Sequence, residues 1–171
     1  GAWVSVQIYA VQTMAQRQTE LTALQTEKQA IESSIATWTA EKANFDAEAV
    51  KSNEALPLLQ AAASNAAEAA KRLPESAELQ TAANGMSQQL QQLEKRITEL
   101  KTQIDDRTAK LAQSQVTMTG MTEQMGQVQT ALGIATAESQ KMETEMQPVQ
   151  QQLNDLTQAV VQVASQLQFF E

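Results

Sequence analysis

Apolar residues recur along the first part of this chain at alternating spacings of three and four, which places them on one face of an α-helix. They occupy the a and d positions of a heptad repeat: Met14, Leu21, Leu24, Ile31, Ile35, Trp38, Phe45, Ala49, Leu56, Leu59, Ala63, Ala66, Ala70 and Leu73. A heptad seam of this length predicts a helix that pairs with a second helix. Near the N-terminus, Val4, Ile8 and Val11 lie one position off the seam, which suggests a local drift of the apolar stripe.

A second stretch repeats the pattern in one phase from Leu79 to the C-terminus. Its a and d positions include Leu79, Ala83, Met86, Leu90, Leu93, Ile97, Leu100, Ile104, Leu111, Met118, Met121, Met125, Val128, Leu132, Ala135, Met142 and Met146. The glycines of this stretch and Pro148 fall at b or c, on the outer face, where they weaken a helix without opening the seam. We expect residues 117–136, which carry three of these glycines, to fray most easily, and Pro148 to kink the helix.

The segment between the two stretches, residues 71–77, is expected to reverse the chain. Pro74 cannot donate a backbone hydrogen bond and disfavours the α conformation at Leu73, so one helix should end here. Proline also suits the first turn of a new helix, where Glu75 and Glu78 would meet the positive end of the helix dipole. We therefore assign the hairpin turn to Leu73, Pro74, Glu75 and Ser76.

The two seams can be tested against this turn. In an antiparallel helix pair, each a position shares a layer with a d position of the other helix, so the paired residue numbers add to a constant, here about 149. That sum gives an a–d layer at every pair tested: Phe45 with Ile104, Trp38 with Leu111, Ile31 with Met118, Leu24 with Met125, Leu21 with Val128, and Leu59 with Leu90. The turn and the seams therefore predict the same register. In that register Lys42 lies opposite Arg107, beside Asp46, Asp105 and Asp106, which suggests a polar layer that helps to fix the alignment.

Pro57 leaves an alternative open. A proline inside a helix removes one hydrogen bond and costs about 3 kcal/mol, so it kinks or breaks the helix. Because the heptad runs unshifted from Phe45 to Leu59, we favour a kink over a reversal. The alternative is a spectrin-like bundle of three helices with reversals near Pro57 and Gly120.

These patterns predict an all-α fold, a long antiparallel helical hairpin that forms a two-stranded coiled coil with a C-terminal helical extension. We expect a first arm over residues 1–73, a second arm over 74–147, and the extension over 148–171, all in one elongated domain that is part of a larger protein. The extension finds no partner in the chain and would expose an apolar stripe, and such stripes usually mark an interface. The candidate interface residues are Val149, Leu153, Leu156, Val160, Val163, Leu167 and Phe170. Upstream sequence, a second copy or folding back could cover them, and we favour a homodimer.

Composition narrows the function classes. The 171 residues include five Gly, three Pro and few aromatic residues, which agrees with a chain that is helical almost throughout. The net charge of −8 and the absence of a run of Lys or Arg argue against nucleic-acid and anionic-membrane partners. The chain contains no Cys and no His, which removes most metal ligands, thiol chemistry and the usual general base. The segment 3–11 is too short to span a membrane.

Two groups of side chains could carry chemistry, and each has a simpler explanation. The methionines of the second seam could form a soft-metal or promiscuous binding stripe, but core positions favour packing. Asp105 and Asp106, with Glu99, could bind a cation, but neighbouring helical residues point in different directions. We therefore predict no catalytic, cofactor-binding or metal-binding residues and no small-molecule substrate.

A resemblance rests on the succession of residues 55–59, 66–73 and 74–79, followed by a Gln/Lys/Glu-rich heptad helix. This succession resembles the long helical insert of large planctomycete proteins that combine a cytochrome-c-like domain with WD40-type repeats, and it covers nearly the whole chain. The chain has no CxxCH motif and no propeller repeat, so haem binding and electron transfer do not carry over. The resemblance implies a spacer or interaction element in an extracytoplasmic protein, in the periplasm or cell envelope.

We therefore expect a non-catalytic structural spacer or protein-interaction coiled coil. The main alternative is a helical protein that associates with membranes by an amphipathic face. That function calls for a basic polar face flanked by aromatic residues, and the acidic balance contradicts it. An enzyme is least expected, because a pair of helices encloses no pocket for convergent titratable groups.

Overall fold

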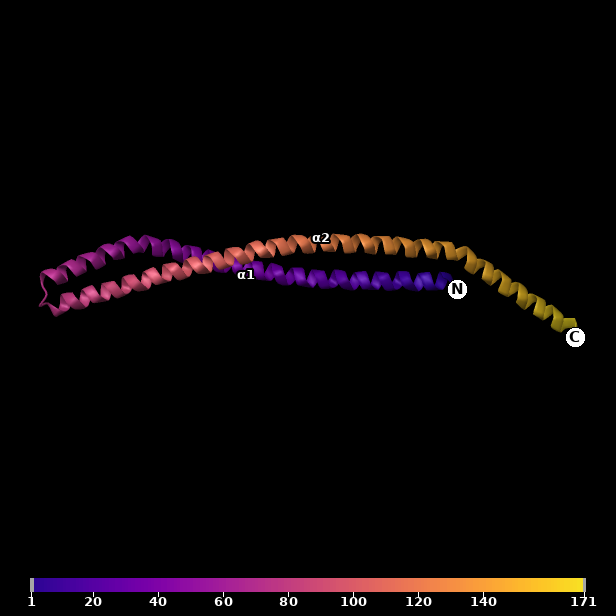
Figure 1. Ribbon diagram of the computed structural model, residues 1–171. Helices are drawn as coiled ribbons and strands as arrows, with labels where there is room; N and C mark the ends of the chain where they lie inside the picture. Colours follow the sequence, from indigo (N-terminus) through magenta and orange to yellow (C-terminus); the bar gives the residue numbers. More distant parts are fainter. Residues whose placement is uncertain (1, 171) are drawn as a thin grey trace. The chain divides into compact units, whose positions relative to one another are not determined.

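The computed structural model describes residues 2–170, and in it the chain forms two long α-helices joined by a short turn, α1 (Ala2–Arg72) and α2 (Ala77–Phe170) (Figure 1). Residues 2–170 contain no strand. The predicted all-α helical hairpin is confirmed. The three-helix alternative is wrong, because α1 continues through Pro57 and α2 continues through Gly120 without a reversal.

The hairpin consists of two compact units. Unit 1 combines Gly1–Lys28 with Gly120–Glu171, and unit 2 is Gln29–Thr119, which contains the turn. Each unit therefore pairs a part of α1 with a part of α2. The side chains of Ala2, Trp3, Val6, Phe169 and Phe170 lie outside the described part of the chain.

The turn occupies residues 73–76, where the sequence places it, and it is a β-turn. The backbone N–H of Ser76 donates to the carbonyl of Leu73 at 3.1 Å, so Pro74 and Glu75 are the central residues. Proline is favoured at the first central position because its ring fixes φ near the required value. The prediction that Pro74 lies in the first turn of the second helix is wrong, since α2 begins at Ala77.

Ser76 caps the start of α2. Its Oγ accepts a hydrogen bond from the backbone N–H of Leu79 at 3.3 Å, and its carbonyl accepts the first bond of the helix from Gln80 at 3.2 Å. The side-chain amide of Gln80 also donates to the carbonyl of Ala70 at 3.1 Å, near the end of α1. Backbone N–H and C=O groups that have no partner within their own helix therefore form hydrogen bonds on both sides of the turn.

In unit 2, the buried residues occupy the a and d positions of the predicted seam. Leu100, at a d position, has no exposed surface, and Ala70, Ser52 and Ser114 are also buried. By contrast, Leu58 is 75% exposed because it lies at a c position. The heptad phase, rather than hydrophobicity alone, therefore decides which side chains are covered.

In unit 1 the same phase reaches the start of α1. Ala10 and Ser139 are both buried, at d and a positions whose numbers add to the predicted constant. The suggested drift of the stripe is wrong, because Val4, Ile8 and Val11 are 49–52% exposed. Burial follows the unshifted positions of α1 because α2, whose pattern never changes phase, determines which side of α1 is covered.

Both internal prolines lie within continuous helix. Figure 1 shows a bend in α1 within unit 2, and α2 bends in its yellow C-terminal part. The preference for a kink over a reversal in α1 is confirmed by the unbroken helix through Pro57. Gly85, Gly120 and Gly126 face outward, since a Cβ built on each would have no neighbour within 4 Å.

Candidate interaction face

The seam of α2 continues beyond the part that α1 covers. Met142 and Met146 are half-buried, whereas every residue of α2 from 147 to 168 is exposed. We call the apolar residues at a and d positions of this segment the C-terminal face: Val149, Leu153, Leu156, Val160, Val163 and Leu167. They are 50–64% exposed. Phe170 was also among the predicted interface residues, but its side chain lies outside the described part of the chain.

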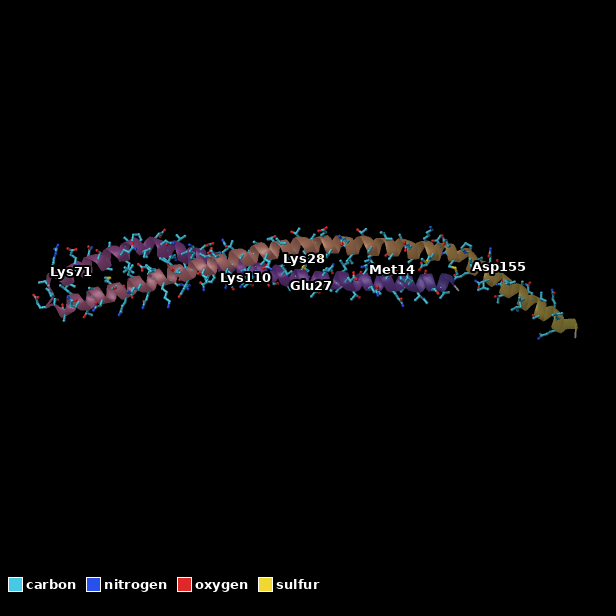
Figure 2. The ribbon with its side chains drawn as sticks, in the orientation of Figure 1. Met14, Glu27, Lys28, Lys71, Lys110 and Asp155 are labelled. Atoms are coloured by element: carbon cyan, nitrogen blue, oxygen red, sulfur yellow. The ribbon has the colours of Figure 1, made fainter. Side chains whose placement is uncertain are left out.

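The C-terminal face lies in an almost uncharged segment. Asp155 is the one charged residue between 147 and 168, and it stands at a c position, away from the face. Figure 2 shows Asp155 on a part of α2 that no second helix accompanies. Its carboxylate accepts a hydrogen bond from the side chain of Gln151 at 3.2 Å. The e and g positions beside the face hold Gln, Thr and Ala.

A second polar feature lies within unit 2, around Arg107. Its guanidinium donates hydrogen bonds to Glu41 of α1 and to Asp106, and it lies 5.6 Å from the ring centre of Phe45. The pKa of Arg107 is raised, chiefly because Glu41 accepts its hydrogen bond and also because Asp106 does. An ion pair between the helices therefore lies at the predicted polar layer, and its carboxylate comes from Glu41, which the prediction did not include.

Lys42, Asp46 and Asp106, which are other members of the predicted layer, form ion pairs within their own helices. Lys42 pairs with Asp46 at 3.2 Å, and Lys110 pairs with Asp106 at 3.1 Å. The pKa of Asp106 is lowered by its hydrogen bonds with Lys110 and Arg107. These contacts follow the helical spacing of four residues, which brings side chains of opposite charge together on one helix surface.

Sequence reasoning missed the most regular contact between the helices. Arg96 of α2 donates two hydrogen bonds to Glu48 of α1, from Nε at 2.8 Å and from Nη2 at 2.7 Å. The hydrogen bonds from Arg96 hold the pKa of Glu48 below its usual value. Both residues occupy g positions, which face each other in antiparallel helices. A search of flanking positions for opposite charges would have found this pair.

A hollow between the helices in unit 2 is open to solvent, and only one of the residues that line it is titratable. It has a volume of about 290 Å³ and is lined by Ile31, Trp38, Lys110, Gln113, Ser114 and Thr117. Its one titratable group, Lys110, lies 5.8 Å from the ring centre of Trp38 and also pairs with Asp106. Lys110 therefore takes part in a cation–π contact and an ion pair, which are common stabilising contacts on protein surfaces.

The carboxylates that the sequence offered as a cation site bind arginines instead: Asp106 pairs with Arg107, and Glu99 pairs with Arg96. Among the methionines of the second seam, Met121 is buried, as a packing role requires. Over residues 2–170, no group of three acidic, His or Cys side chains is placed to hold a metal ion. In the same range, no helix is long and apolar enough to cross a membrane.

No family model, no curated protein and no solved structure matches this chain. The resemblance to the helical insert of planctomycete proteins therefore stays a prediction. The residues themselves define the class of the fold, a two-helix hairpin whose second helix carries an uncovered apolar face.

Proposed function

We propose that this chain is a non-catalytic structural element that connects proteins by helix pairing, in the manner of an antiparallel coiled coil. One observation carries the proposal. The a and d positions that α1 covers as far as Met146 continue in the same phase from Val149 to Leu167, where they are exposed. A surface with the spacing of a helix-pairing seam is suited to a helix of the same spacing.

The size of the face supports an interaction of moderate strength. Fully burying a Val or Leu side chain contributes about 1.5–3 kcal/mol, so covering these half-exposed side chains contributes about 1 kcal/mol each. Association itself costs at least about 4 kcal/mol in lost translational and rotational freedom. The face therefore needs a partner with an apolar stripe of its own, since contacts with polar groups would not offset that cost.

The charge distribution favours a protein helix over a membrane as the partner. Amphipathic helices that lie on anionic membranes carry Lys and Arg on the polar face. No Lys or Arg follows Lys141 in this sequence, and the polar positions around the face are mainly Gln. The face is therefore apolar but lacks the electrostatic attraction that would hold it on anionic lipid.

A synthetic helix tests this function directly. The probe is a four-heptad peptide with Leu at every a and d position and a neutral mixture of Gln, Lys and Glu elsewhere. We expect it to bind the full chain and to slow hydrogen exchange of the amides of residues 149–168. Binding should be lost in a variant with Leu153→Gln, Leu156→Gln and Val160→Gln, which removes the centre of the face.

The matched control carries the same kinds of substitution at exposed positions outside the face. Leu58→Gln and Val116→Gln change residues that are more exposed than any residue of the face, and Val161→Gln changes a residue that is as exposed as Val160. This control should bind the peptide like the unmodified chain. Equal binding by both triple variants, or no binding by the unmodified chain, would show that the C-terminal face is not a helix-pairing surface.

A further inference from the structure

We infer that the partner of the C-terminal face is the same face of a second copy of this chain. The two copies of α2 pair antiparallel, about a two-fold axis that passes level with Gln158. This inference rests on the proposed function, because it names the helix that the face binds.

The order of the side chains along the face carries the inference. When paired residue numbers add to about 316, each layer joins an a position to a d position, as antiparallel pairing requires. The layers are then Val149 with Leu167, Leu153 with Val163, and Leu156 with Val160, each repeated across the axis. Every layer combines one Val with one Leu, so large and small side chains alternate and the layers have equal volume.

Neighbouring registers use the face less completely. A shift of one heptad toward the N-terminus places Val163 and Leu167 opposite Met146 and Met142, which already lie in the half-buried part of the seam. A shift of one heptad toward the C-terminus leaves Val149 and Leu153 without a partner in the face, because the last residue of the face is Leu167. The register centred on Gln158 is the one that pairs the face with itself and with nothing else.

Charge also favours a second copy. Two chains that each carry a net charge of −8 repel each other over most of their surfaces. The segment 147–168 is the exception, because Asp155 is its one charged residue and points away from the face. A charged partner helix would find no opposite charge at the e and g positions, whereas a second copy brings the same neutral side chains.

The geometry leaves the existing hairpin undisturbed. In unit 1 the seam is covered as far as Met146, and the face begins at Val149, so a second copy docks beside residues that are exposed. No Gly or Pro lies between 149 and 168, and α2 is continuous there. From Val149 to Leu167 the face is about 27 Å long at 1.5 Å per residue, which suits a reversible dimer rather than an obligate one.

Single cysteines test both the partner and the register, because the chain has no cysteine of its own. Ala159 occupies a g position next to the axis, and its copy lies about 3 Å away along the helix direction in the proposed register. Gln166 is a g position one heptad later, and its copy lies about 24 Å away along the same direction. A disulfide requires Cα atoms within about 7 Å.

Under mild oxidation of the native chain, Ala159→Cys should form a disulfide-linked dimer at least about tenfold faster than Gln166→Cys, because the offset of about 24 Å along the helix direction keeps the sulfur atoms of Gln166→Cys apart. Thr157→Cys, at the e position on the other side of the axis, should behave like Ala159→Cys. All three residues are exposed, so helix content measured by circular dichroism should be unchanged.

Equal cross-linking of Ala159→Cys and Gln166→Cys would overturn the proposed antiparallel register. If neither Ala159→Cys nor Thr157→Cys cross-links, pairing of two copies in this register is wrong. The synthetic peptide distinguishes a failure of self-pairing from a failure of the proposed helix-pairing function. Peptide binding without cross-linking would retain a helix-pairing face that serves another protein, whereas loss of both would remove the proposed function as well.

Discussion

Arg96 and Glu48, 48 residues apart in the sequence, are joined across the two helices by paired hydrogen bonds of 2.8 and 2.7 Å. A planar guanidinium that meets both oxygens of a carboxylate accepts little change in geometry, so the pair restrains the sliding of one helix along the other. Apolar layers repeat every heptad and tolerate a shift by a whole heptad, whereas this ion pair does not. The ion pair therefore helps to fix the alignment of the two helices, whereas the apolar seam stabilises them mainly by burying side chains.

Glu48→Gln should destabilise unit 2 at neutral pH, and the effect should depend on pH. Because Arg96 lowers the pKa of Glu48 below its ordinary value of 4.5, the stabilisation is present above pH 4.5 and is lost as the pH falls through the lowered pKa. Urea denaturation of the two chains should therefore differ at pH 7 and converge toward pH 3. Glu54→Gln, at an exposed outer position, is the control. A difference that persists at low pH would rule out the carboxylate as the cause.

Ser76→Ala should weaken the hairpin at its turn. The Ser76 hydroxyl caps α2 by accepting the hydrogen bond from Leu79, and removal of such a cap costs about 1 kcal/mol. The same substitution at Ser64, an exposed residue within α1, should be neutral or slightly stabilising because Ala is the better helix former. Denaturant midpoints measure both changes. Equal effects at the two serines would contradict the assignment of the cap.

Leu100→Ala should be among the most damaging single substitutions in unit 2. Leu100 is fully buried, and a Leu to Ala change in a core costs about 2–5 kcal/mol, here toward the lower end because the seam between two helices can partly collapse. Leu58→Ala, at an exposed position, should change the free energy of unfolding by less than about 0.5 kcal/mol. Chemical denaturation followed by circular dichroism gives both values, and comparable losses would contradict the heptad phase.

Gly126→Ala should stabilise α2. A methyl group at this position meets no atom within 4 Å, and Ala is favoured over Gly inside a helix by about 0.8–1.0 kcal/mol. Gly120→Ala and Gly133→Ala should have similar, roughly additive effects, since their surroundings are equally open. Hydrogen exchange of residues 117–136 should slow in the triple variant. Destabilisation would show that these positions face a neighbour.

The sequence predicted the features that repeat, and missed those that depend on single side chains. The burial of Leu100 and the exposure of Leu58 follow from heptad phase, which many residues determine together. The role of Ser76 was missed because the proline two positions earlier gave the stronger helix-start signal, although proline suits a β-turn equally well.

In unit 2 and at the start of α1, too, the sequence did not predict what individual side chains do. Glu48 and Arg96 were overlooked because they flank the seam at g positions, where exposed ion pairs usually contribute little to stability. Val4 and Ile8 attracted attention as apolar residues, but α2 determined which positions of α1 are covered. The exposure of the C-terminal face could be predicted because the register set by the turn pairs residues 1–72 with positions before Val149. Its partner could not be predicted from phase alone, because any helix with a complementary seam would fit.

The central claim is that the face from Val149 to Leu167 pairs with the same face of a second copy, and sedimentation equilibrium tests it most directly. At on the order of tens of micromolar, where a micromolar association is populated, the chain should sediment with about twice its mass of 18.6 kDa. Leu156→Glu places like charges near the two-fold axis and should return the chain to 18.6 kDa, whereas Val161→Glu, an equally charged change outside the face, should leave the dimer intact. A dimer that survives Leu156→Glu, or an unmodified chain that sediments at 18.6 kDa, would contradict the account.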